Sequence, residues 1–439
     1  MKLLYSIVIL FILGSCSFDN KSGIWKNENN AFEENDITFK DFKKITSETE
    51  IFNSEISFEN NQSLKIDVPF QNQSWKDIHF SKNNNLKNFK YNDLNQVVFK
   101  SKKLTKNQIN NYLLFENNKL ILSDKRGNII IYSKKDNLVI SKFNFYKKKY
   151  KKLDKFLNLI VDKNIIFVSD NIGFIYAYNY ETNKIIWAKK LKVPFRSNIK
   201  LNNEKLITAN QNNDLFIIDK TNGKIKKLIP TEDTIINNTF VNNISLNENN
   251  IFFLNTYGSL YSINIDNFKF NWFINLNKNI NLDLSNLFYG SELVNYGNKI
   301  IVSSDQYFYV INSKTGTIFT KKNFSLAAKP IINNNYIFLV TKNNLLLAMD
   351  ADKGEIIFSH DIGLKIANFI NSKKKSLNIK NLMLVNNKLF LFLKNSYIVQ
   401  FNLKGDIIKI IKLSSRINSQ QIFIDSFLFY LDKKNKLIV

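Results

Sequence analysis

GFIYAYNYETNKIIWAKKLKVPFRSN, residues 173–198, joins a strand-like run, a polar turn, a tryptophan and a basic loop. Looser copies of this unit recur along the chain. Seven strands align with its GFIYAYN segment, and they end at Ser133, Asn179, Asp219, Asn264, Asn312, Asp350 and Asn402. The intervals between these ends run from 38 to 52 residues, with a mean of about 45, which is the period of four-stranded propeller blades. The repeat therefore predicts a β-propeller.

The turn after each aligned strand has its own pattern. Glycine or asparagine recurs four residues after most strand ends, and such residues tolerate the left-handed backbone of a tight turn. These residues are Asn137, Asn183, Gly223, Gly316 and Gly354, with Gly405 after three. Phe268 occupies this position in one unit, so we expect that turn to differ. The Asp and Asn residues at the strand ends recur once per repeat, which favours turn capping over carboxylate catalysis.

Large aromatic residues occur eight positions after three of the strand ends, at Trp187, Trp272 and Phe358. An aromatic side chain at a fixed point of each repeat can wedge between neighbouring blades and bury a large area. We therefore expect these three residues to pack between blades. Ligand binding by the tryptophans is the alternative.

The repeated strands are apolar on both faces, as expected for sheets that are covered on both sides. The C-terminal stretch SFLFYLDKKNKLIV begins an eighth unit but ends before its last strand. A strand within Val68–Phe80, which contains Trp75, is expected to complete that blade, because open sheet edges aggregate. We predict an all-β fold: an eight-bladed propeller of four-stranded antiparallel blades over residues 71–439, closed by N- and C-terminal strands.

The first residues indicate export. The apolar run from Leu3 to Leu13 is too short to span a bilayer as a helix and is typical of a signal peptide, here residues 1–15. Leu13-Gly14-Ser15-Cys16 resembles the lipobox of bacterial lipoproteins, which implies lipidation of Cys16, the chain's single cysteine. The polar stretch 16–70 is then a lipid-anchored tether, and Ser17 favours the periplasmic face of the outer membrane. A plain secretory signal is the alternative.

The chain has a formal net charge of +25 but only two histidines. Its lysines are spread along the whole sequence, so we predict no nucleic-acid partner. The basic run 145–155 is either a solvated loop or a contact with anionic lipid. No zinc-type Cys/His cluster, phosphate loop or dinucleotide motif occurs, and we predict no catalytic residue, metal or cofactor.

The repeat units resemble the family of repeats first known from pyrroloquinoline-quinone enzymes. The similar segments are YAYNYETNKIIW, FIIDKTNGKIKK, YVINSKTGTIF and LAMDADKGEIIF. Together with the lipobox and the length, they make the chain similar to the BamB-like lipoproteins of the outer-membrane β-barrel assembly machinery. The resemblance implies a non-enzymatic scaffold, a monomer within a complex. Its partners would be the POTRA domains of the BamA insertase and unfolded outer-membrane proteins.

The same resemblance implies a partner-binding surface. Val193, Phe195 and Arg196 match an inter-blade loop of the family, with Phe195 as the apolar anchor and Arg196 as the donor to partner oxygens. Glu232 and Asp233 correspond to acidic residues in the loop of the following blade. An ordinary blade connection is the alternative for the first loop. Two other functions stay open for the whole chain: a quinone-dependent dehydrogenase, and a propeller that binds another periplasmic partner.

Overall fold

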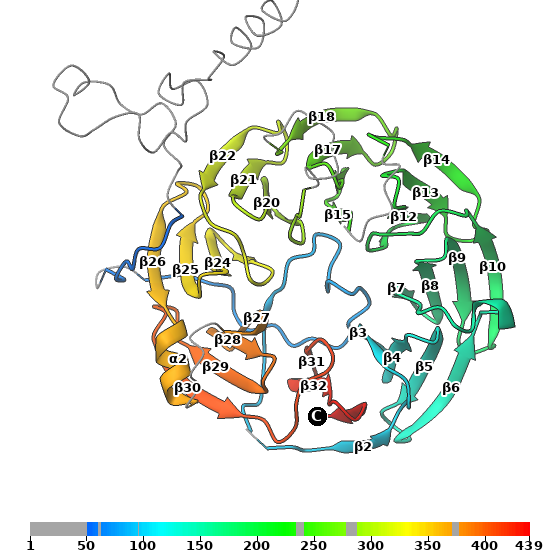
Figure 1. Cartoon of the computed structure of the whole chain (residues 1–439), viewed down its shortest axis with the longest axis horizontal. Coiled ribbons are helices and arrows are strands. Elements are labelled where there is room, and N and C mark those ends of the chain that lie inside the picture. Colours follow the sequence, from blue (N-terminus) through cyan, green and yellow to red (C-terminus); the bar gives the residue numbers. More distant parts are fainter. Residues whose placement is uncertain (1–50, 60–62, 95, 234–240, 278–287, 371–376) are drawn as a thin grey trace, which may run out of the picture. The chain divides into compact units, whose positions relative to one another are not determined.

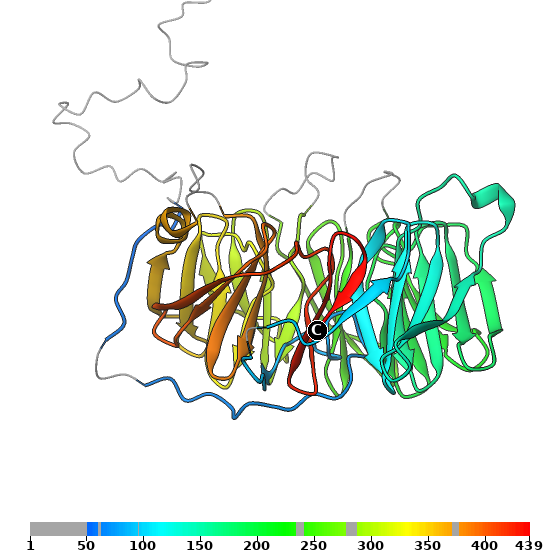
Figure 2. The ribbon, with the colours of Figure 1, turned by 90° about the horizontal axis from the view of Figure 1, so that it is seen from below.

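The computed structural model describes residues 51–59, 63–94, 96–233, 241–277, 288–370 and 377–439. In these residues eight β-sheets stand side by side around a central axis, which Figure 1 shows from one end and Figure 2 from the side. The helices described are one short α-helix, α2 (Gly363–Phe369), and the 3₁₀ turn Lys148–Tyr150, and no described helix could cross a membrane. The prediction of an all-β, eight-bladed propeller is confirmed.

The blades are numbered here in chain order, and the strands of each run from the axis to the rim. Blades 1 and 2 contain β3 (Ile109–Glu116), β4 (Lys119–Asp124), β5 (Asn128–Ser133) and β6 (Leu138–Asn144), then β7 (Leu157–Asp162), β8 (Ile165–Asp170), β9 (Phe174–Asn179) and β10 (Lys184–Lys190). Blades 3 and 4 contain β11 (Lys200–Asn202), β12 (Lys205–Ala209), β13 (Leu215–Asp219) and β14 (Ile225–Ile229), then β15 (Asn243–Leu246), β16 (Asn250–Leu254), β17 (Ser259–Asn264) and β18 (Phe270–Asn275).

The second half of the ring repeats this order. Blades 5 and 6 contain β19 (Val294–Tyr296), β20 (Lys299–Ser303), β21 (Phe308–Asn312) and β22 (Ile318–Lys322), then β23 (Ile331–Asn333), β24 (Tyr336–Val340), β25 (Leu345–Asp350) and β26 (Ile356–Asp361). Blades 7 and 8 contain β27 (Ile379–Val385), β28 (Lys388–Leu393), β29 (Tyr397–Phe401) and β30 (Ile407–Lys412), then β31 (Ile422–Ile424), β32 (Phe427–Leu431), β33 (Lys436–Ile438) and β2 (Lys100–Lys103). A fifth strand, β1 (Asn88–Phe89), pairs in parallel with β27.

The ring closes through blade 8, where the N-terminal strand β2 pairs with the C-terminal strand β33. Closure by both ends of the chain is therefore confirmed, but the expected closing strand, Val68–Phe80, was wrong. The strand that blade 8 needed for completion lies at the rim of the ring. The lysines of β2 suit such a solvated edge, and only Ser101 of that strand is buried. Trp75 instead lies fully buried beside Phe80 and Phe89.

Residues 70–92, named here the central segment, run through the middle of the ring (Figure 1). This segment contacts the innermost strand of every blade, and it meets the blades in ring order as the chain advances. The contacts pair Asn72 with Phe423, Trp75 with Phe115, Asp77 with Ile160, Ser81 with Lys200, Lys82 with Leu246, Asn83 with Asn295, Asn85 with Ile332, and Phe89 with Val385. One stretch of chain thus ties all eight blades together at the axis.

The recurring aromatic residue and the recurring turn glycine of the repeat meet across the boundary between blades. Trp187 of blade 2 lies against Gly223 of blade 3, and its Nε1 donates a hydrogen bond to the Lys220 carbonyl at 2.8 Å. The same contact joins the other two aromatic residues to the next blade, through the pairs Trp272 with Gly316 and Phe358 with Gly405. Blades 2, 4 and 6 therefore each present an aromatic ring to a turn in which the next blade has no side chain.

The strand-end residues cap the turns that follow. In each of the seven repeats the side-chain oxygen accepts a backbone N–H two or three residues on, and the acceptors are Ser133, Asn179, Asp219, Asn264, Asn312, Asp350 and Asn402. Turn capping is confirmed, but the expectation for Phe268 was wrong. Its φ is 60°, and its N–H donates to the Asn264 carbonyl as Gly223 donates to that of Asp219. Phe268 adopts the shared turn despite its side chain.

The folded unit extends upstream of the boundary predicted at residue 71. The compact unit that contains the propeller begins at Ile51. Ile56 exchanges backbone hydrogen bonds with Ser359 of β26, and Phe58 packs edge-on against Phe358. Part of the stretch expected as a tether therefore lies along blade 6. The predicted signal peptide and Cys16 lie outside the described residues.

Candidate partner-binding site

The first candidate loop joins β10 to β11 and is fixed by the turns on either side of it. The Phe195 N–H donates to the Asp170 carbonyl at 2.9 Å, and the Arg196 N–H donates to that of Ala209 at 3.1 Å. Pro194 accepts a hydrogen bond from the Gln211 N–H at 2.7 Å. The backbone of this loop is thus held in one conformation by blades 2 and 3.

Phe195 does not have the role that the family resemblance implied. Its side chain is 2% exposed and packs against Phe216, with ring centroids 5.8 Å apart. It belongs to a core cluster that also contains Trp187 and Ile199. A residue this deeply buried cannot be an anchor for a partner, so Phe195 is corrected to a core residue that fixes the loop from beneath.

Val193 and Arg196 remain partly accessible on the same loop. The Nε of Arg196 is buried and has no hydrogen-bond partner within the part of the chain that the structure describes. Burial lowers the pKa of Arg196 from its ordinary value, but an arginine stays charged at neutral pH. The loop therefore places a charged, partly accessible arginine beside a partly accessible apolar side chain.

Glu232 lies in the loop after β14, and its carboxylate is already engaged within the protein. It accepts hydrogen bonds from the Ser259 and Tyr261 hydroxyls at 2.5 and 2.6 Å and from the Asn255 amide at 2.6 Å. Burial alone would raise the pKa of Glu232, but these donors outweigh burial and hold it below its ordinary value. Glu232 thus binds the loop to blade 4 and is half-buried, and its contact with a partner stays a prediction. Asp233, next to it, is exposed.

One turn brings the two candidate loops together. The turn Asn210–Asp214, between β12 and β13, contacts the first loop through the Gln211 N–H. It contacts the second through Asn213, whose side-chain amide donates to the Glu232 carbonyl at 2.9 Å. We name Val193, Pro194, Arg196 and Asp233, with this turn, the candidate surface. The role of this turn could not be predicted, because its polar residues look like those of any hairpin.

A metal site is not evident in this region. Nowhere among the described residues do three or more His, Cys, Asp or Glu side chains gather closely enough to hold a metal ion. The candidate surface carries hydrogen-bonding groups, charge and an apolar side chain, which are the kinds of contact found in protein interfaces.

Comparison with known proteins identifies the family. A family model described as outer membrane protein assembly factor BamB matches residues 125–360, more than half of the chain. The chain belongs to the BamB family. The match begins in blade 1, ends in blade 6 and includes both candidate loops. No curated protein matches this BamB-family chain in sequence.

Solved structures similar to this BamB-family chain share its fold at low identity. BamB from Moraxella catarrhalis has a TM-score of 0.60 and 12% identity, over 78% of this chain and 98% of that one. The quinohemoprotein alcohol dehydrogenase ADHIIG from Pseudomonas putida HK5 also has a TM-score of 0.60, at 9% identity, over 82% of this chain and 76% of that one. A computationally designed protein, Ika8, has a TM-score of 0.59 at 10% identity, over 78% and 98%.

Proposed function

We propose that this chain is a non-enzymatic scaffold of the outer-membrane β-barrel assembly machinery. It would bind the POTRA domains of a BamA-like insertase and help unfolded outer-membrane proteins reach it. The observation that carries the proposal is the match of residues 125–360 to the BamB family model. The fold agrees with such a role, because the described chain forms a ring of eight blades around the central segment.

The candidate surface supplies the chemistry for this interaction. The Arg196 guanidinium would donate to carboxylates or backbone carbonyls of a POTRA domain, and arginine is a frequent energetic centre of protein interfaces. Val193 and Pro194 would add apolar contact beside it. Since Phe195 and Glu232 hold the two loops from within the propeller, the surface is arranged before the partner arrives, which reduces the entropy lost on binding.

We expect a BamA-like insertase to copurify with the full chain in mild detergent, and Arg196→Ala to weaken the complex. Truncation of a central interface arginine removes about 2 kcal/mol or more, which corresponds to roughly thirtyfold in affinity. The dissociation constant for the isolated POTRA domains, measured by calorimetry, checks this value.

Arg416→Ala is the matched control, because Arg416 is exposed and lies before blade 8, away from both candidate loops. Its complex should keep the wild-type affinity, and far-ultraviolet circular dichroism should show both variants folded. An unchanged affinity for Arg196→Ala would remove Arg196 from the interface. Recovery of unrelated periplasmic proteins alone would replace the assembly role with that of a propeller for another partner.

We also propose that Cys16 is lipidated and holds the protein at the periplasmic face of the outer membrane. Support comes from the lipobox-like sequence before Cys16 and from the family match. Cys16→Ser should move the protein from the membrane fraction to the soluble periplasmic fraction, because the acyl chains would no longer be attached. Membrane retention of that variant would contradict the lipid anchor.

A quinone-dependent dehydrogenase is the second candidate, favoured by the fold it shares with quinohemoprotein alcohol dehydrogenases. That likeness lies at 9–10% identity and reflects the shared propeller alone. An assay of alcohol-dependent dye reduction, with added quinone cofactor and calcium, separates the two functions. Turnover in that assay would replace the scaffold proposal.

A further inference from the structure

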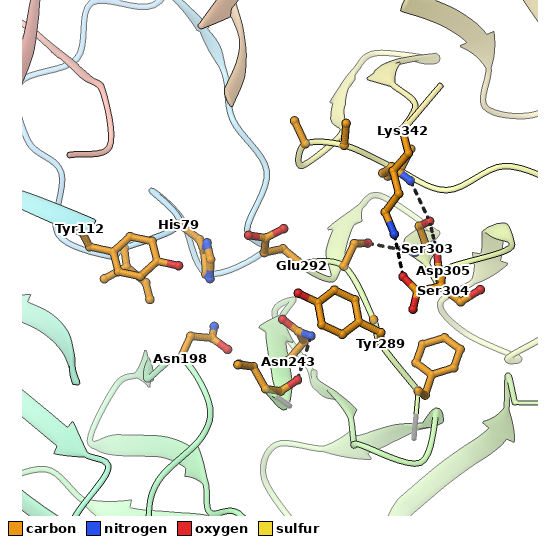
Figure 3. A pocket seen from close by; sticks show the side chains of 18 of the residues that line it. His79, Tyr112, Asn198, Asn243, Tyr289, Glu292, Ser303, Ser304, Asp305 and Lys342 are labelled. Carbon is orange, nitrogen blue, oxygen red and sulfur yellow. Dashed lines mark hydrogen bonds and ion pairs between the residues drawn. The ribbon is translucent and has the colours of Figure 1, made fainter. Parts of the chain in front are cut away.

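A cavity of about 150 Å³ lies on the propeller axis, and we name it the axial cavity. The central segment supplies His79 and Leu86 to its wall, and five blades or their entry loops supply the rest. Those wall residues include Tyr112, Glu292, Lys329, Lys380 and Gln421. A larger cavity, of about 360 Å³, shares His79, Tyr112 and Glu292 with it, and Figure 3 shows these three side chains facing the shared space.

Two lysines in the wall lie beyond ion-pair distance of every carboxylate that the structure describes, although Glu292 and Asp77 are near enough to attract Lys329. Lys329 is 8% exposed, and its one hydrogen bond is a long one, 3.4 Å, to the His79 carbonyl. No carboxylate among the described residues lies within 4.0 Å of the Nζ of Lys329 or of Lys380. Burial lowers the pKa of each to about 8. A buried ammonium normally has a counter-charge, as Lys200 has in Asp77 at 2.7 Å.

The same wall holds acceptors without donors. The side-chain amides of Gln420 and Gln421 donate to the carbonyls of Ile78 and Ser419. Their Oε1 atoms are buried and have no hydrogen-bond partner among the described residues. Burial, together with Lys329 and Lys200, holds the pKa of His79 well below its ordinary value, so that its ring is neutral. The wall therefore carries two ammonium groups against one carboxylate, that of Glu292, and offers unused acceptors as well.

We propose that the axial cavity binds a small oxyanion that bears a hydroxyl group, of the size of inorganic phosphate. Lys329 and Lys380 donate to its charged oxygens, and the glutamine oxygens accept from its hydroxyl. Charge-assisted hydrogen bonds of this kind are the strong ones in a desolvated site. The volume is below the 300 Å³ or so typical of drug-sized ligands, which limits the occupant to a small anion with accompanying water. This site is independent of the candidate surface and of the assembly role.

Calorimetric titration of the full chain with inorganic phosphate, in chloride of matched ionic strength, tests the proposal. We expect saturable binding and a higher midpoint of thermal unfolding in phosphate than in chloride. Lys329→Met and Lys380→Met should each weaken phosphate binding by roughly ten- to a hundredfold. Both variants should fold, because each loses an unpaired buried charge. Sulfate, which has no hydroxyl at neutral pH, should bind more weakly than phosphate.

Lys342→Met is the matched control. Lys342 lines only the larger of the two cavities and pairs with Asp305 at 2.7 Å (Figure 3), so its removal should leave phosphate affinity unchanged. Absence of saturable phosphate binding to the wild-type chain would overturn the proposal and leave the cavity as a water site. Binding that persists in both Lys329→Met and Lys380→Met would also overturn it, and equal affinity for sulfate would remove the glutamines from the site.

Discussion

Asp77→Ala should lower the free energy of unfolding by about 3–5 kcal/mol, because it leaves a buried ammonium group without its counter-charge. The Lys200 side chain is completely inaccessible, and its Nζ lies 2.7 Å from the Asp77 Oδ2. Burial outweighs the attraction of Asp77 and lowers the pKa of Lys200 even in the intact pair. The pair thus adds little net stability itself, but either charge alone would be costly. Chemical denaturation of the full chain measures the loss.

A double variant separates the cost of the unpaired Lys200 charge from the loss of the other contacts that Asp77 makes. Asp77→Leu combined with Lys200→Met removes both charges and should recover most of the stability, since buried pairs are often replaceable by apolar residues. Asp305→Ala, which breaks the exposed pair with Lys342, should change stability by less than about 1 kcal/mol. A double variant as unstable as Asp77→Ala alone would show that the loss comes from the Asp77 hydrogen bond to the His79 N–H or from packing.

The pH dependence of the loss has a definite sign. In Asp77→Ala the pKa of Lys200 lies further below its ordinary value of 10.5 than in the wild type, because its remaining stabilising charge has gone. A lysine with a lowered pKa destabilises the fold fully at low pH, and the penalty falls as the pH rises through the folded-state pKa. The difference between wild type and Asp77→Ala should therefore shrink as the pH rises toward 10.5, the ordinary pKa of lysine.

The central segment shows where sequence reasoning failed. Residues 70–92 belong to no repeat and are rich in asparagine and lysine, and their first part, to Phe80, was predicted to be the closing strand. Their polar groups are instead satisfied one blade at a time, as when the Asn85 amide donates to the Ile332 carbonyl across 247 positions of sequence. A buried polar segment is stable when its hydrogen bonds are made, but partners this distant leave no local pattern. The ring closure through Val68–Phe80 was misassigned for that reason.

The repeat was predictable because its constraints are local and recur. A capped turn needs a short polar residue at the strand end and a residue that accepts positive φ soon after, and both can be read at fixed spacing. The same local pattern cannot report accessibility. Phe195 follows a proline in a polar loop, yet the turn of the next blade covers it. Two residues of the axial cavity wall, His79 and Lys329, are likewise 250 positions apart in the sequence and meet only in the folded ring.

Gly223→Ala should lower the free energy of unfolding by about 2–5 kcal/mol, through two separate effects. Gly223 has a φ of +72°, and an L-residue in the left-handed region costs about 1–2 kcal/mol. An added Cβ would also lie 2.5 Å from Cε3 of the Trp187 indole. Trp187 is held by its hydrogen bond to the Lys220 carbonyl, so it cannot retreat freely, and such overpacking costs about 1–3 kcal/mol more.

Gly297→Ala isolates the first effect. Gly297 also has a positive φ, of +57°, but a Cβ there would meet nothing within 4 Å, so that variant should lose only the 1–2 kcal/mol or so of backbone strain. Gly223→Ala made in a Trp187→Ala background should lose the same amount, because the clash has been removed. The additional loss of stability at Gly223 measures the steric contact between blades 2 and 3. It equals the coupling energy of the double-mutant cycle formed by Gly223→Ala and Trp187→Ala. Equal losses at Gly223 and Gly297 would mean that the indole yields without penalty, and the repeated aromatic–glycine pair would then not act as a wedge between blades.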